Sequence, residues 1–160
     1  MKARLWLTYV LCAAMGMAVY FFLFLHIKWT LFPYVKALNV LFGFHFHETA
    51  DGYEALGSGF AITETCGGVN LFISLYMILV FGFLRRFPGT LQRVAVALAC
   101  VGIALLIAFL ATLGRIIISL PFCEWRHFKL GHTVLSLCVF YGTGLWVYMR
   151  AQKIVRRICP

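Results

Sequence analysis

Residues 63–70 read Thr-Glu-Thr-Cys-Gly-Gly-Val-Asn and mark the point where a polar segment gives way to a long apolar one. A cysteine in the first turn of a helix lies at the positive end of the helix dipole and near free backbone N–H groups, which favour the thiolate over the thiol. The two glycines after it leave no side chain to block a large substrate that approaches the sulfur. This stretch therefore predicts a reactive Cys66 at the start of an apolar helix.

The composition is that of an integral membrane protein. The chain has 160 residues, of which 63% are hydrophobic and only 12% are charged, which is too little polar surface to coat a soluble domain. A helix needs about 20 apolar residues to cross the hydrocarbon layer. We therefore expect a single all-α transmembrane domain over residues 1–160, with four spans at Leu5–Leu25, Cys66–Leu84, Val94–Gly114 and Leu130–Met149.

The net charge of +9 is explained by the positions of the basic residues. Those that flank the expected spans lie at the same helix ends, namely Lys2, Arg4, Arg85, Arg86, Arg93, Arg150, Lys153, Arg156 and Arg157. By the positive-inside rule these ends are cytoplasmic, so both termini are expected to be cytoplasmic and the chain to be a multi-pass protein of the plasma (inner) membrane. The basicity thus indicates topology and no nucleic-acid partner. The first apolar run is longer than the 7–15 residues of a signal-peptide core, so we expect it to be retained.

Two segments precede the Cys66 stretch on the expected outer side. Residues 29–44 are apolar but contain Pro33, Lys36 and Asn39, a composition that favours a helix lying in the extracytoplasmic interface. Residues 45–65 are polar and rich in glycine and are expected to form a solvated loop. Alternate residues of a strand share a face, so His45, His47 and Glu48 leave a metal-binding strand open as the alternative.

The cysteines do not favour a thiol relay. Cys12, Cys100 and Cys138 fall inside apolar helices and Cys159 in the cytoplasmic tail, where a cysteine acts as a small hydrophobic residue. Cys66 and Cys123 reach the oxidising outer side, and the sequence has no Cys-x-x-Cys motif.

Two further polar residues fall at the outer ends of apolar segments. The apolar run of the third span continues beyond Arg115 as far as Pro121, so the arginine is either snorkelling at the interface or set inside the apolar zone, where an arginine usually has a function. His132 opens the fourth span and is either an interfacial histidine or an acid–base group that faces the bundle. We expect Arg115 and His132 to meet Cys66.

These motifs together resemble the exosortase/archaeosortase family of membrane cysteine transpeptidases, and the short chain is similar to the compact exosortase K subclass. The resemblance rests on Cys66-Gly67-Gly68, on Thr112-Leu113-Gly114-Arg115 and on the helix-opening His132, and it covers roughly Cys66 to Tyr148. Family members have a Cys-Ser-Gly core and an Asn-x-x-Arg ending. Here Gly67 replaces the serine and Thr112 replaces the asparagine.

The resemblance implies cleavage of a C-terminal sorting signal on an exported, membrane-anchored protein, and transfer of the new carboxyl end to a lipid, glycan or other surface acceptor. Cys66 would attack the peptide carbonyl, Arg115 would stabilise the oxyanion, and His132 would act as acid and base on the extracytoplasmic side. Neither a metal nor an organic cofactor is needed. Glu64 either orients one of these groups or is simply solvated.

Two other classes of protein stay open. The first is a non-enzymatic transporter subunit or assembly partner, in which Arg115 and His132 make a polar contact between helices. The second is a redox protein that pairs Cys66 with Cys123.

Overall fold

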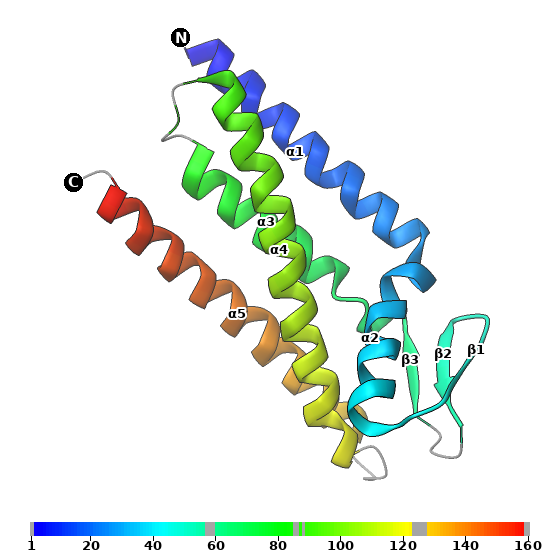
Figure 1. The fold of residues 1–160 in the computed structure, drawn as a ribbon. Coiled ribbons are helices and arrows are strands. Elements are labelled where there is room, and N and C mark those ends of the chain that lie inside the picture. Colours follow the sequence, from blue (N-terminus) through cyan, green and yellow to red (C-terminus); the bar gives the residue numbers. More distant parts are fainter. Residues whose placement is uncertain (1, 57–59, 85–86, 88, 123–127, 159–160) are drawn as a thin grey trace.

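The computed structural model describes residues 2–56, 60–84, 87, 89–122 and 128–158. The chain is mainly helical, with a small sheet between the second and third α-helices (Figure 1). The elements in chain order are α1 Lys2–Leu25, α2 Ile27–Phe42, β1 Phe46–Glu48, β2 Gly52–Ala55, β3 Ala61–Thr63, the 3-10 helix η1 Glu64–Cys66, α3 Val69–Phe83, α4 Thr90–Ser119, the 3-10 helix η3 Leu120–Phe122 and α5 Phe128–Ile158.

The described residues contain four helical segments that are long and apolar enough to cross a membrane, which is consistent with the predicted all-α membrane fold. These candidate spans are Trp6–Leu25, Glu64–Phe83, Thr90–Phe122 and Leu130–Ile154. The helices of the third and fourth predicted spans, which are α4 and α5, extend beyond the predicted bounds at both ends. In α4 this happens because the apolar run continues through Arg115, and the α-helix ends only at Ser119, two residues before Pro121.

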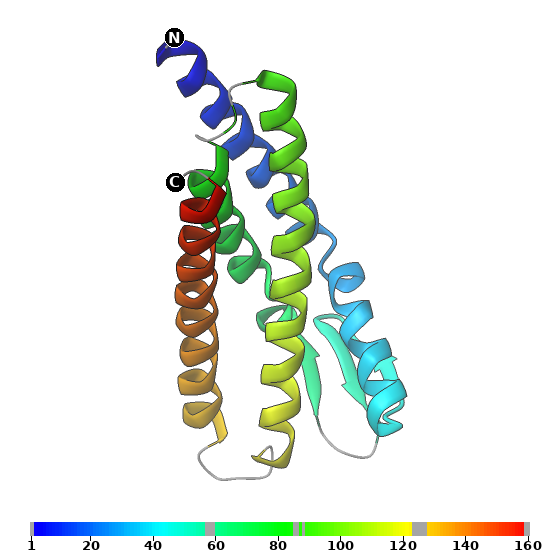
Figure 2. The same cartoon turned by 60° about the vertical axis from the view of Figure 1, so that its left-hand side comes forward.

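Helix α3 lies at the centre of the bundle and contacts α1, α4 and α5 (Figures 1 and 2). Its large buried side chains, such as Phe72, Leu75 and Tyr76, fill the core. The facing stripe of α4 consists mainly of small residues at helical spacing, which are Ala97, Cys100, Ala104, Ala108 and Thr112. Small residues let helix backbones approach closely in a membrane bundle.

The two ends of the bundle differ in their contents. The start of α1 and the end of α5 lie at one end, together with the C-terminal end of α3 and the start of α4 (Figure 1). The small sheet, α2, the C-terminal end of α4 and the start of α5 lie at the other end (Figures 1 and 2). The basic residues near the termini are therefore separated from the acidic residues of the sheet along the length of the bundle.

The expectation of a solvated loop over residues 45–65 is wrong. This segment forms an antiparallel sheet in the order β1-β2-β3, with His47 opposite Glu54 and Tyr53 opposite Ile62. The sheet gains its core by packing against α2, because Ala55, Phe60 and Ile62 are buried in one cluster with residues of that helix. Twenty residues that cannot bury a core alone thus fold against a neighbouring helix.

The sheet also accounts for the candidate metal ligands. His47 Nε2 lies 3.6 Å from a carboxylate oxygen of Glu54 on the paired strand, and Glu48 forms an ion pair with Lys28 of α2 at 2.6 Å. Within the part of the chain that the structure describes, no group of three or more His, Cys, Asp or Glu side chains could hold a metal ion.

The helix expected over residues 29–44 is present as α2 and begins two residues earlier. Its buried residues Leu31, Tyr34 and Leu38 follow helical spacing and face the sheet cluster. Helix α2 therefore covers the region that contains Cys66.

Candidate functional site

Cys66 does not open the third α-helix as the sequence predicted. It is the last residue of η1, and α3 begins three residues later at Val69. Gly68 separates the two helices because its φ of 65° and ψ of 10° are left-handed values that a right-handed helix cannot contain. Cys66 therefore precedes the positive end of α3, with a two-residue glycine turn between them.

The Cys66 side chain is buried, with 6% of its surface exposed. It belongs to an apolar cluster with Leu31 and Leu38 of α2, Ile62 of β3 and Ile116 of α4. The cysteine is free, and Cys123, its partner in the redox alternative, lies outside the described residues. The nucleophile proposed from the sequence is thus held beneath α2 and the sheet.

The turn after Cys66 presents backbone donors. Gly68 caps the N-terminus of α3 and supplies no side-chain hydrogen bond to its first turn. The first N–H groups of a helix have no partner within the helix itself. The Gly67 N–H donates to the Glu64 carbonyl oxygen at 3.0 Å, and the positive end of the α3 dipole begins three residues after Cys66, whereas the sequence argument placed Cys66 in the first turn of the helix.

Arg115 lies inside α4 and reaches two other elements. Its Nη2 donates to the carbonyl oxygen of Thr65 at 3.2 Å, and its Nη1 donates to Oγ of Ser136 at 3.0 Å. Its Nε is buried and has no hydrogen-bond partner among the described residues. The described residues form ion pairs only between Lys28 and Glu48 and between His47 and Glu54, so no described carboxylate neutralises Arg115 at that range.

His132 is the fifth residue of α5 and not the third as predicted, because this helix begins at Phe128, two residues before Leu130. Ser136 follows it by one turn and donates its hydroxyl to the His132 carbonyl oxygen at 2.6 Å. The imidazole is close enough to Arg115 for the guanidinium charge to act on it. The structure thus joins Arg115 to the residue before Cys66 on one side and to the His132 helix on the other.

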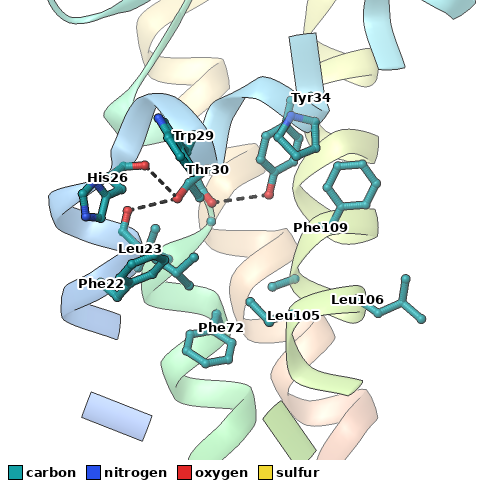
Figure 3. Close-up of a pocket in the computed structure, with 15 residues that line it drawn as sticks. Phe22, Leu23, His26, Trp29, Thr30, Tyr34, Phe72, Leu105, Leu106 and Phe109 are labelled. Carbon is teal, nitrogen blue, oxygen red and sulfur yellow. Dashed lines mark hydrogen bonds between the residues drawn. The ribbon is translucent and has the colours of Figure 1, made fainter. Parts of the chain in front are cut away.

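Two cavities flank the glycine turn. The first has a volume of about 570 Å³ and is lined mostly by aromatic and aliphatic side chains of α1, α2 and α4, with Gly67 and Gly68 in its wall (Figure 3). The second, of about 500 Å³, contains Arg115 and Ser136 together with Glu64, Thr65 and Gly68. Neither Cys66 nor His132 lines either of these two cavities.

Tyr34 is a buried residue of this region that the sequence argument did not include. Its phenol hydroxyl donates a hydrogen bond to the carbonyl oxygen of Gly67 at 3.3 Å. Burial raises the pKa of Tyr34 to about 12, although a hydrogen bond from Thr112 and the charge of Arg115 act in the opposite direction. Nothing in the sequence of α2 marked this tyrosine, since the resemblance began only at Cys66.

Ser136 was also missed, although a signal existed. It follows His132 by four residues, which places the two on one face of a helix. Cys123, the other cysteine that the sequence argument placed on the outer side, lies outside the described residues. Glu64 is exposed and lines the Arg115 cavity.

No protein-family model, no curated protein and no solved structure matches this chain.

Proposed function

We propose that this chain is a membrane-embedded cysteine transpeptidase of the exosortase type. It would cleave a C-terminal sorting signal of exported, membrane-anchored proteins and transfer the new carboxyl end to a lipid or glycan acceptor at the cell surface. The proposal rests on the residue pattern that resembles this family and on the surroundings of Arg115.

The observation that carries the proposal is the bridge made by one guanidinium group. Arg115 donates to Thr65, the neighbour of Cys66, and to Ser136, one turn from His132. An arginine inside an apolar span is costly and usually serves a function. Here it joins a cysteine turn to a histidine helix, with neutral acceptors at both bonds, so its charge is still available to a developing oxyanion.

The proposed chemistry is acyl transfer through a thioester. The Cys66 thiolate attacks the carbonyl carbon of the scissile peptide bond, and the Arg115 guanidinium stabilises the tetrahedral oxyanion, a role worth about 3 kcal/mol. An imidazole can both give and take a proton, so His132 would protonate the leaving amine as the C–N bond breaks. It then takes a proton from the acceptor, which attacks the thioester and releases the Cys66 sulfur.

Access to the sulfur follows from the cavities. Gly67 and Gly68 line the apolar cavity and Gly68 also lines the Arg115 cavity, so the glycine turn is the wall that the two share. A substrate in either cavity would therefore lie against the turn that follows the buried Cys66.

The proposed orientation uses the charge asymmetry of the bundle. Basic residues such as Arg93, Arg150 and Lys153 belong to the end with the termini, which the positive-inside rule assigns to the cytoplasm. The sheet lies at the opposite end, and the Cys66 turn follows directly after its last strand. The site would then face the extracytoplasmic side of the plasma membrane, where exported proteins present their sorting signals.

Replacement of Cys66 tests the proposal. Tagged membrane-anchored candidates would be co-expressed with Cys66→Ala and Cys66→Ser variants, and mass spectrometry would identify their new C-termini. We expect processing to be abolished at an unchanged protein level. Cys100→Ala is the matched control, because Cys100 is also buried but lies in the bundle core, and it should process normally.

Two outcomes would contradict the proposal. If the cellular role of the chain survives Cys66→Ala, the chain is a non-enzymatic membrane component. If thiol trapping finds Cys66 quantitatively oxidised, the redox pairing with Cys123 is correct and no thiolate nucleophile exists.

A further inference from the structure

Tyr34 ties α2 to the peptide bond that follows Cys66. It is buried, with 3% of its surface exposed, and its ring packs against Phe109 of α4 at a centroid distance of 4.9 Å. Its hydroxyl donates to the Gly67 carbonyl oxygen, 3.3 Å away, and the dashed line from the Tyr34 hydroxyl in Figure 3 marks this bond. The phenol thus has an apolar ring contact on one helix and a polar contact on the turn.

Thr112 of α4 lies next to both Tyr34 and the glycine turn. Its hydroxyl is hydrogen-bonded to Tyr34, and both residues lie against Gly68. A side chain at Gly68 would collide with Thr112 Oγ1 and would come within 3.3 Å of the Tyr34 oxygen. The glycine turn is therefore enclosed by two hydroxyl groups that belong to two different helices.

This enclosure selects one orientation of the Gly67–Gly68 peptide group. In a planar trans peptide the C=O and N–H groups point in opposite directions. Because the Gly67 carbonyl faces Tyr34, the N–H of Gly68 faces away from it. Neither glycine has a Cβ that restricts its dihedral angles, so without Tyr34 the turn depends on two backbone bonds, from Gly67 N–H to the Glu64 carbonyl oxygen at 3.0 Å and from Phe72 N–H to the Gly68 carbonyl oxygen at 2.9 Å.

We propose that Tyr34 is a positioning residue that fixes the Gly67–Gly68 peptide and thereby holds the Cys66 turn in one conformation. The catalytic consequence rests on the proposed function, whereas the conformational one does not. Thr112 supports the same arrangement by bonding the phenol. Loss of the Tyr34 hydroxyl leaves the Gly67 carbonyl without this partner and lets the turn adopt other conformations.

The test compares two buried tyrosines. Tyr34→Phe removes the bond to Gly67, and Tyr76→Phe is the matched control, because the Tyr76 hydroxyl donates to the Cys12 carbonyl oxygen at 2.8 Å in the bundle core. Alkylation of Cys66 by N-ethylmaleimide would be followed by mass spectrometry of its peptide in the full-length, membrane-embedded chain as a function of pH. We expect Tyr34→Phe to raise the limiting rate at high pH about fivefold, the value of one net hydrogen bond. Tyr76→Phe should change it less than about twofold.

The outcomes separate the inference from the proposed function. Equal effects of the two variants on Cys66 alkylation overturn the positioning role. A selective Tyr34→Phe effect in a chain that processes no substrate leaves the positioning role intact and removes the proposed function. In an active chain we expect kcat to fall about fivefold at constant KM.

Thr112→Val keeps the inference testable if Tyr34→Phe does not fold. This variant removes one hydroxyl at nearly constant volume and should raise the limiting alkylation rate about twofold, because it removes the bond that supports Tyr34 and leaves the bond to Gly67. A rate no greater than that of Tyr76→Phe would count against the inference.

Discussion

The two ends of this molecule are held together by different kinds of contact. At the end that carries the termini, α1, α3, α4 and α5 pack through apolar and small side chains, with the Tyr76 hydroxyl bonded to a backbone carbonyl. Around the residues that follow the small sheet, polar contacts connect the elements instead. Arg115 donates to the Thr65 carbonyl oxygen, just before Cys66, and to the Ser136 hydroxyl of α5. This second region also contains Gly68 in a left-handed conformation and the buried Nε of Arg115, which has no hydrogen-bond partner among the described residues.

The comparison suggests a division of labour. The apolar end can supply stability without any specific chemistry, since packing depends on volume and shape. The polar end keeps groups that cost stability, and such groups persist where function needs them. Four changes test whether this division is real.

The largest effect is expected from Arg115→Lys. Lysine keeps the positive charge but cannot present the planar fork that donates to Thr65 and Ser136 at once. We expect processing of the sorting signal to fall by about 100-fold or more, measured as kcat/KM with a tagged substrate. Arg93→Lys is the matched control at the other end of α4, where Nε donates to the Phe87 carbonyl oxygen, and it should leave processing unchanged. Similar losses in both variants would show that α4 needs arginine only as an anchor.

The second effect separates the two cores. Leu75 and Leu38 are both fully buried, but the first belongs to the bundle and the second to the cluster around Cys66. Replacement of either by alanine should cost about 2–5 kcal/mol of local packing free energy. We expect Leu75→Ala to lower the thermal unfolding midpoint of the whole chain, and Leu38→Ala mainly to increase Cys66 alkylation below that midpoint. If Leu75→Ala exposes Cys66 equally, the two ends unfold as one unit.

The third effect concerns the glycine turn. Gly68→Ala places a Cβ on a residue with a φ of 65° and against Thr112, so we expect a loss of about 2 kcal/mol in the free energy of unfolding. Gly102→Ala is the control inside α4, where an added Cβ meets no atom within 4 Å. That change should be neutral or stabilising by up to about 1 kcal/mol. Chemical denaturation of both variants measures the difference, and equal values would mean that the turn is not constrained.

The smallest effect is expected at the sheet surface. Glu48→Gln removes the ion pair with Lys28, whose side chain is 40% exposed against 57% for Glu48. Exposed ion pairs contribute less than about 1 kcal/mol, so the thermal midpoint and the Cys66 alkylation rate should hardly change. Glu54→Gln, which affects the longer contact with His47, provides the comparison. A large shift from Glu48→Gln alone would show that the sheet is held to α2 by charge and not by its apolar cluster.

The spans could be predicted from the sequence because each one is a continuous apolar run whose length matches the hydrocarbon layer. The end of α4 near Pro121 could also be predicted, since proline acts locally. The same reasoning failed for β1, β2 and β3. Their pairing depends on contacts between distant residues and on Leu31 and Leu38 of α2, none of which leaves a strong local pattern.

The candidate site divides in the same way. The chemical types of Cys66, Arg115 and His132 are visible in the sequence, and their helices could be placed. The start of α3 could not, because Gly68 becomes a left-handed cap only where Tyr34 and Thr112 surround it. Tyr34 itself could not be singled out, because it is one of seven tyrosines in the chain and no residue near it in the apolar helix distinguishes it.

The length of α4 has a consequence for how the protein senses its bilayer. Arg93 and Arg115 are 22 positions apart on one continuous helix, which at 1.5 Å per residue separates them by about 33 Å. That span is close to the thickness of a typical hydrocarbon layer, about 30 Å. A thinner or thicker bilayer creates a hydrophobic mismatch, to which a helix responds by tilting. Tilt of α4 would move the guanidinium relative to Thr65 and Ser136, so lipid chain length should tune the geometry of the site.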